Sequence, residues 1–275
     1  MADDWGEDAT RRAKAALIST EAPNAARVID FLYGGQNNFE ADRKAGRALA
    51  TAAPVVAAVS PAVRAFEQRV LRFLVTEVGV RQFLDIGFGL PLVGATHEVA
   101  QSLAPECRIV YVDDDPMVLS HARALLRSAP GGAVGYVDAH LHDPGEIVAG
   151  AKETLDFSQP VAVMLLFTLA YITDAAEAAT VVSSLMTAAP PGSYAVIFHL
   201  ASDMDPAIAD AVRKWNELMP EQRIALRSRR EVATFTAGLD PVAPGLVPVS
   251  EWRPAPGDPS FDSAVPVYAS VARKQ

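Results

Sequence analysis

The chain has 275 residues with a net charge of -9, and half of its residues are apolar. This length allows one large domain, or one domain with an extension. The acidic balance argues against general nucleic-acid binding, which needs clustered Lys and Arg. Cys107 is the only cysteine, so an internal disulfide and a cysteine-based metal cluster are excluded.

The start of the chain, MADDWGEDATRRAK, has no apolar signal core. No apolar run approaches the ~20 residues of a membrane span. A single cysteine also suits a reducing compartment. We therefore expect a cytoplasmic protein with a small-molecule substrate, no nucleic-acid or membrane partner and no bound metal. The oligomeric state stays open.

Helices are predicted ahead of the first strand at about 10–20, from 24 to the glycines at 34–35, at 39–53, and from about residue 60 with Pro61 in its first turn. From residue 80 the pattern alternates between strand and helix. Strands are expected at 81–86, 108–113, 133–138, 160–167 and 193–200. This alternation predicts a parallel sheet covered by helices on both faces.

After residue 205 the alternation ends. Two helices are predicted, at about 206–218 and 228–238, followed by strands near 246–252 and 265–272 that can pair as an antiparallel hairpin at one sheet edge. We expect an N-terminal helical extension or lid over 1–79 and one continuous α/β domain over 80–275.

The segment RQFLDIGFGLP combines a buried strand ending in Asp85 with a turn containing Gly87 and Gly89. About two dozen residues later, IVYVDDDP ends a second strand in acid, beginning with Asp113. This layout is typical of a nucleotide-containing cofactor in a doubly wound sheet. The alternative for the glycines is an ordinary strand-to-helix turn.

A dinucleotide fingerprint has a third glycine where this chain has Leu92. The carboxylate of Asp85 would also oppose an anionic pyrophosphate. It suits a ligand with an ammonium and a sulfonium group, such as S-adenosylmethionine. Asp113 can then accept hydrogen bonds from the ribose hydroxyls.

The stretches FLDIGFGLP, THEVAQ and VYVDDDPMVLSHARALL resemble the class I S-adenosylmethionine-dependent methyltransferases. More narrowly, the chain resembles an actinobacterial family of predicted S-adenosyl methyltransferases with uncharacterised substrates, through ARVIDFLYGGQNNFEADR, YVDAHLHDP and GLVPVSEWRP. The resemblance implies a Rossmann-like, seven-stranded sheet that is mostly parallel, with the last strand antiparallel. It also implies a cofactor across the C-terminal ends of the first three strands.

The resemblance further implies that particular residues bind the cofactor. Asp85, Gly87 and Gly89 would line the methionine moiety, Asp113 would bind the ribose, and Asp114 would lie beside the adenine. Pro91 stands where the wider class often has a third glycine. After the third strand, an acid often meets the adenine amino group, and here Asp138, followed by Ala139, is favoured over His140.

The best histidine candidate for a catalytic base is His199, near the end of the strand 193–200. Its alternative role is that of a buried structural histidine. The stretch LLFTLAYITD after the fourth strand contains no histidine, so no histidine base is expected there.

The segment YGGQNNFEADR contains paired glycines and asparagines ahead of the sheet. We hypothesise that it forms a lid over the methionine end and part of the acceptor site, through Tyr33, Gly34, Gly35, Asn37 and Asn38. The alternative is a helix C-cap at Gly34 followed by an N-cap at Asn38.

Together these features predict methyl transfer from S-adenosylmethionine to an unidentified small molecule. Two alternatives remain at this point. One is an NAD(P)-dependent oxidoreductase on a similar sheet, and the other is a non-catalytic regulator that binds S-adenosylmethionine.

Overall fold

The computed structural model describes residues 19–275, so nearly all of the helix predicted over 10–20 lies outside the described residues. The next three predicted helices are present as α2 (Ala25–Leu32), α3 (Glu40–Ala52) and α4 (Val56–Arg72), which continues into the π-helical turn η1 (Phe73–Glu77). α4 begins four residues before its predicted start, and Pro61 lies inside it. The reason is a tight first turn, in which the N–H groups of residues 56–58 bond three residues back.

The central sheet has its first five strands in parallel. They are β1 (Gln82–Ile86), β2 (Arg108–Asp113), β3 (Ala133–Asp138), β4 (Ala162–Leu166) and β5 (Tyr194–Leu200). The last long strand, β8 (Val267–Arg273), is antiparallel to β5. The strand order is β3-β2-β1-β4-β5-β8-β6. The predicted mostly parallel sheet with an antiparallel last strand is confirmed.

Two short strands change the predicted strand count. β6 (Asp240–Pro241) and β7 (Val247–Pro248) both pair with β8, which gives eight strands instead of seven. β8 therefore lies between β5 and the two short strands, and its antiparallel pairing with β7 is the one predicted for this sheet edge. The prolines at 241 and 248 fit this outer position, because proline cannot donate to a further strand.

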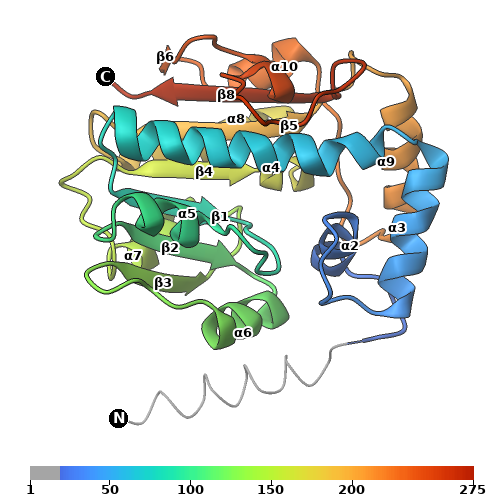
Figure 1. The fold of residues 1–275 in the computed structure, drawn as a ribbon, viewed down its shortest axis with the longest axis horizontal. Helices are drawn as coiled ribbons and strands as arrows, with labels where there is room; N and C mark the ends of the chain where they lie inside the picture. Colours follow the sequence, from blue (N-terminus) through green and yellow to red (C-terminus); the bar gives the residue numbers. More distant parts are fainter. Residues whose placement is uncertain (1–18) are drawn as a thin grey trace.

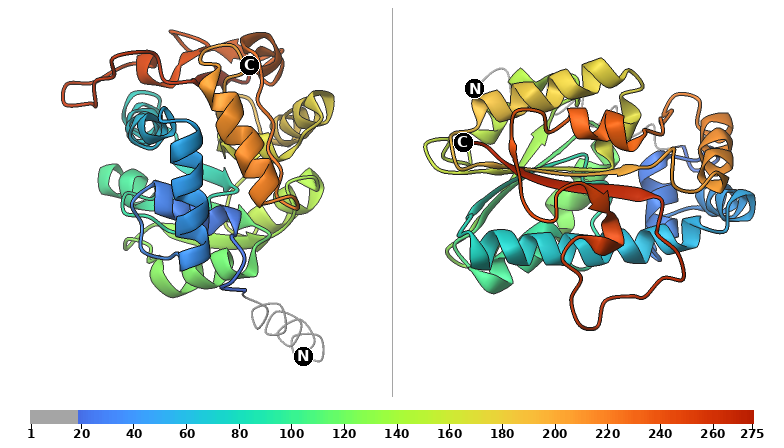
Figure 2. Two further views of the ribbon diagram at one scale, coloured as in Figure 1. Left: turned by 90° about the vertical axis from the view of Figure 1, so that its right-hand side faces the viewer. Right: turned by 90° about the horizontal axis from the view of Figure 1, so that it is seen from above.

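Helices cover both faces of the sheet (Figure 2, right). One face carries α4, α5 (Thr96–Leu103) and α6 (Pro116–Leu125), and the other carries α7 (Pro144–Ala151), α8 (Ala175–Ala188) and α10 (Arg229–Thr234). The short 3-10 helices are η2 (Thr168–Tyr171) and η3 (Val249–Glu251). Each sheet face therefore has its own apolar layer, as alternation along buried strands requires.

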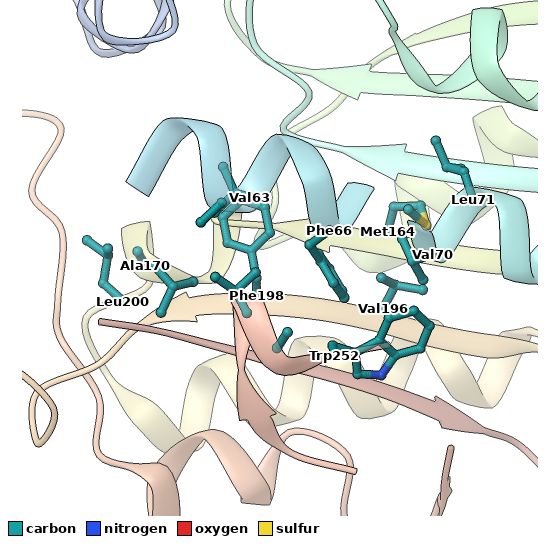
Figure 3. Packing of buried hydrophobic residues seen from close by; sticks show 14 of the residues in the cluster. Val63, Phe66, Val70, Leu71, Met164, Ala170, Val196, Phe198, Leu200 and Trp252 are labelled. Atoms are coloured by element: carbon teal, nitrogen blue, oxygen red, sulfur yellow. The ribbon is translucent and has the colours of Figure 1, made fainter. Parts of the chain in front are cut away.

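Helix α4 packs against one face of the sheet and contributes to its hydrophobic core. Figure 3 shows Val63 and Phe66 of this helix packed against Phe198 of β5 and Trp252. The Phe66 and Trp252 rings meet edge to face with centroids 5.4 Å apart. One hydrophobic core thus joins residues on both sides of the expected division at residues 79 and 80.

Three helices stand across the C-terminal ends of the parallel strands. These are α2, α3 and α9 (Ala207–Leu218), at the right of Figure 1. α3 packs against both α2 and α9. A buried ion pair between Arg27 and Asp42, 2.8 Å apart, ties α2 to α3. The helices form a wall opposite the edge where ligands bind in open α/β sheets.

Within residues 19–275 no single helix is long and apolar enough to cross a membrane. The pair formed by α3 and the continuous α4–η1 helix meets the length and composition criteria together, with a 104° bend between them.

Candidate active site

A cavity of about 560 Å³ lies between the C-terminal ends of the central strands and the helical wall. The loops after β1, β2 and β4 form its floor, while α2, α4 and α9 contribute side chains from the opposite side. Its volume is in the range of small-molecule sites.

The loop after β1 requires glycine for two reasons. Gly87 and Gly89 have φ angles of 69° and 68°, which side-chain-bearing residues rarely adopt. A Cβ on Gly87 would also lie 2.3 Å from Oγ1 of Thr168, at the start of η2. Both predicted glycines line the cavity, and Gly87 additionally lets the loop after β4 approach closely.

The two predicted strand-end acids also line this cavity. Asp85 is buried and accepts a hydrogen bond of 2.6 Å from Oγ1 of Thr96, and burial raises its pKa to about 6. Asp113 accepts from the backbone N–H groups of Gly89 and Asp115, and burial raises its pKa to about 7. Each carboxylate keeps lone pairs for a ligand.

Of the side chains expected near the adenine, some line the cavity and Asp138 does not. Asp114, Ala139 and His140 line the cavity, and Nε2 of His140 lies 3.3 Å from the carboxylate of Asp114. Asp138 is exposed and is not among the lining residues. Because β3 is an edge strand, its last side chain can turn toward solvent. The choice of Asp138 over His140 is therefore not supported by this geometry.

His199 lies away from the cavity. Along β5, Phe198 and Leu200 face the cavity side of the sheet, so His199 between them points to the opposite face. It is fully buried, with Nε2 2.6 Å from Nη1 of Arg227 and Nδ1 2.9 Å from the Leu200 carbonyl oxygen. Burial lowers its pKa to about 4. The expectation of a catalytic base is wrong, and the alternative structural role describes this residue.

Tyr33 is the one hypothesised lid residue, within the described chain, that lines the cavity. The rest of the segment is organised by Asp30, whose Oδ2 accepts from the backbone N–H of Asn37 and the side-chain amide of Asn38. Gly35 packs so tightly that a Cβ there would lie 2.0 Å from Asp30 Oδ1.

The helix caps of this segment agree only in part with the alternative considered from the sequence. Gly34, at φ 78°, follows the C-cap Tyr33 of α2, as expected for a terminating glycine. The N-cap of α3 is Phe39 rather than Asn38. Asn38 instead accepts a hydrogen bond from Arg43. The segment is mainly a turn between two helices.

Two charged residues missed by the sequence analysis reach the cavity from α4. Arg64 and Glu67 lie one helical turn apart, with Nη1 and Oε2 separated by 3.5 Å. Arg64 also donates to the Val93 carbonyl oxygen in the glycine loop. Burial, opposed by Arg64 and reinforced by Asp85, raises the pKa of Glu67 to about 7. The spacing of apolar residues in α4 predicted the face that packs in the core, but it did not indicate that the face carrying Arg64 and Glu67 lines a cavity.

This arrangement fits S-adenosylmethionine, which brings a methyl group on a positively charged sulfur. Three carboxyl groups with raised pKa values line the cavity, the buried Asp85 and the half-buried Glu67 and Asp113, and such groups favour a cationic ligand. The guanidinium of Arg64, beside Glu67, can pair with the carboxylate of the same ligand. Among the described residues, no group of three or more His, Cys, Asp or Glu is placed to hold a metal ion.

The strand order and this acid- and glycine-lined cavity are those of a class I methyltransferase. The family described as S-adenosyl methyltransferase matches residues 11–275, and the chain belongs to that family. It is therefore an enzyme that transfers methyl groups from S-adenosylmethionine, and the oxidoreductase and non-catalytic alternatives are set aside. No curated protein matches the sequence.

Two solved structures are similar over nearly the whole chain. A DUF574 family protein from Streptomyces avermitilis is 35% identical, with a TM-score of 0.88, over 93% of this chain and 99% of the other. A candidate methyltransferase from Thermobifida fusca is 37% identical, with a TM-score of 0.84, over 93% and 96%. The plantazolicin methyltransferase BpumL, solved with SAH, shares the fold at 11% identity, a TM-score of 0.54 and coverages of 91% and 95%.

Proposed function

We propose that this methyltransferase acts in the cytoplasm on a small-molecule acceptor, and that α4 holds the amino-acid end of its cofactor. The observation that carries the proposal is the pair Arg64 and Glu67 on the cavity side of α4, beside Asp85. A free amino-acid group carries one ammonium and one carboxylate, and this corner of the cavity offers the opposite charges.

In this arrangement Asp85 and Glu67 receive the ammonium and Arg64 receives the carboxylate. Charge-assisted hydrogen bonds of this kind are stronger than neutral ones. Asp113 accepts from the ribose hydroxyls, and Asp114 and His140 lie on the adenine side. The Arg64 bond to the Val93 carbonyl oxygen ties the same side chain to the glycine loop, which positions the guanidinium before the ligand binds.

A small acceptor is supported by the size of the cavity, which cofactor and acceptor share. The protein contributes position and exclusion of water, because displacement at an already activated methyl carbon needs close, aligned reactants. The buried free thiol of Cys107 supports a reducing cytoplasm.

The test is calorimetric titration with two ligands that differ only in the amino-acid group. S-adenosylhomocysteine carries it, and 5′-methylthioadenosine lacks it. We expect Arg64→Gln and Glu67→Gln to weaken binding of S-adenosylhomocysteine at least tenfold and to leave binding of 5′-methylthioadenosine within twofold.

Arg47→Gln serves as the matched control, because Arg47 is an exposed arginine on α3 that pairs with Glu40 outside the cavity. Equal losses for both ligands, or no loss for either, would show that α4 does not hold the amino-acid end.

A further inference from the structure

One side of the cavity, which we call the chamber, is lined by apolar side chains from four helices. The wall residues are Ile29 from α2, Leu49 from α3, Val59 from α4, and Ile208 and Val212 from α9. Figure 2 (left) shows α3 and α9 side by side at this end of the molecule. These five side chains offer no hydrogen-bond partners, so burying a sugar hydroxyl against them would cost free energy.

Three aromatic rings lie close together in this cavity. Phe167, Tyr171 and Trp215 all line the cavity, and their ring centroids lie 5.6, 6.4 and 6.5 Å apart. The indole N–H of Trp215 is used elsewhere, because it donates to the Gln222 carbonyl oxygen at 2.7 Å. The rings therefore offer faces and edges to a ligand, a surface that favours another flat ring.

Phe167 is held in an unfavourable backbone conformation. Its φ angle is 74°, although it carries a bulky side chain, and its N–H donates to the Phe198 carbonyl oxygen. Such a conformation costs free energy and persists where the surrounding structure enforces it, often at ligand sites. Here it directly follows β4 and places the ring at the cavity.

Two hydroxyl groups at the same place lack partners in the protein. Among the described residues, neither Tyr33 nor Tyr171 forms a hydrogen bond through its hydroxyl, although both side chains line the cavity. Burial raises the pKa of each well above the ordinary value for tyrosine, and each hydroxyl thus stays neutral and able to donate. A ligand atom that accepts or donates here would satisfy them.

We propose that the chamber binds one class of acceptor: a flat, mostly apolar ring compound whose single hydroxyl or amino group meets Tyr33 and Tyr171. The inference rests on the proposed function, since the chamber opens onto the cofactor side within one cavity. The occupant is a small molecule, because both ligands must fit in about 560 Å³.

The experiment measures binding to the protein saturated with S-adenosylhomocysteine, which blocks the cofactor side. The probe is 2-naphthol, and its fully saturated counterpart decahydro-2-naphthol has the same carbon skeleton and hydroxyl without the flat ring. We expect 2-naphthol to bind at least tenfold more tightly, and glucose to give no measurable heat. Absence of 2-naphthol binding, or equal affinity for the two bicyclic probes, overturns the proposal.

A space-filling variant localises the binding without removing any core side chain. Val59→Trp should fill the chamber and weaken 2-naphthol binding at least tenfold, while S-adenosylhomocysteine affinity stays within twofold. Tyr171→Phe should weaken 2-naphthol binding about fivefold through the lost hydroxyl. The control is Phe39→Leu, which changes an aromatic residue outside the cavity and should alter neither affinity.

These results separate the two proposals. If Val59→Trp leaves 2-naphthol binding unchanged, the chamber is not its site and the inference fails, while cofactor binding stands. If the unmodified protein binds no S-adenosylhomocysteine, the proposed function itself fails.

Discussion

The two halves of the cavity are built in different ways. The cofactor half comes from consecutive strand ends, where Asp85 and Asp113 lie at the C-terminal ends of β1 and β2 and Gly87 directly follows β1. The acceptor half comes from helices far apart in the sequence, such as α2 and α9, and from rings of the β4 loop. The side chains that line the acceptor half are mostly apolar, whereas those of the cofactor half include several carboxylates.

This difference means that the cofactor half is constrained by backbone geometry and the acceptor half by packing. A glycine with positive φ or a carboxylate at a strand end has few substitutes. An apolar wall tolerates exchange of one aliphatic side chain for another of similar volume. Within one fold, such a construction lets the acceptor change while the cofactor stays the same.

The largest expected effect comes from Gly87→Ala in the cofactor half. The new Cβ would meet Thr168 Oγ1 at 2.3 Å, and the φ of 69° adds backbone strain. We expect the affinity for S-adenosylhomocysteine, measured by calorimetry, to fall about 100-fold, or roughly 2.7 kcal/mol.

Gly34→Ala is the matched control for Gly87→Ala. Gly34 has a φ of 78°, its Cβ would meet no atom within 4 Å, and it lies outside the cavity. It should lower the free energy of unfolding by about 1–2 kcal/mol through strain alone and leave affinity within twofold. Equal losses of affinity in both variants would contradict a special role for the β1 loop.

The sequence predicted the cofactor half because its signals are local. The strand, the acid and the glycines around Asp85 follow one another directly, and Asp113 repeats the pattern at the next strand. The prediction of His199 as a catalytic base failed because successive side chains along a strand point to opposite faces of the sheet. A position near the strand end does not show which face the side chain points to. The acceptor half was not predicted because Trp215 and Val59, far apart in the sequence, line one cavity only through tertiary packing.

His199→Ala should destabilise the fold without affecting the cofactor half. The change leaves a cavity and removes the acceptor from the buried Arg227 guanidinium, and loss of such a partner costs about 1–3 kcal/mol. Urea unfolding should show this loss, while calorimetry should show S-adenosylhomocysteine affinity within twofold of the unmodified protein. A large loss of affinity with unchanged stability would return His199 to the site.

Lowering the pH should change cofactor affinity and protein stability in opposite directions. The folded pKa values of Asp85, Asp113 and Glu67 are raised to about 6, 7 and 7, so these groups contribute stability at low pH that is lost as the pH rises through those values. The same groups must be ionised to hold a cation. Between pH 8 and pH 5.5, S-adenosylmethionine affinity should fall about tenfold, or ~1.4 kcal/mol.

Glu67→Gln isolates the contribution of one carboxyl group to this dependence. In the ligand-free protein it should raise the free energy of unfolding at pH 8 by on the order of 1 kcal/mol, because a buried charge with an imperfect partner is removed. At pH 5.5 the gain should shrink, since the carboxyl of the unmodified protein is then largely neutral. Urea unfolding at the two pH values measures the gain, and an equal gain at both would contradict the raised pKa.

The smallest effect is expected from Asn38→Ala, in the turn first considered as a lid. Asn38 donates to Asp30 Oδ2 at 2.7 Å and to the Gly35 carbonyl oxygen at 3.0 Å, and its side chain does not line the cavity. Loss of these bonds should cost about 1 kcal/mol of unfolding free energy. Affinity for S-adenosylhomocysteine should stay within twofold, because α2 keeps Tyr33 in place through its own backbone hydrogen bonds. A tenfold loss of affinity without loss of stability would instead place this turn in the acceptor half, as a lid that closes over the ligand.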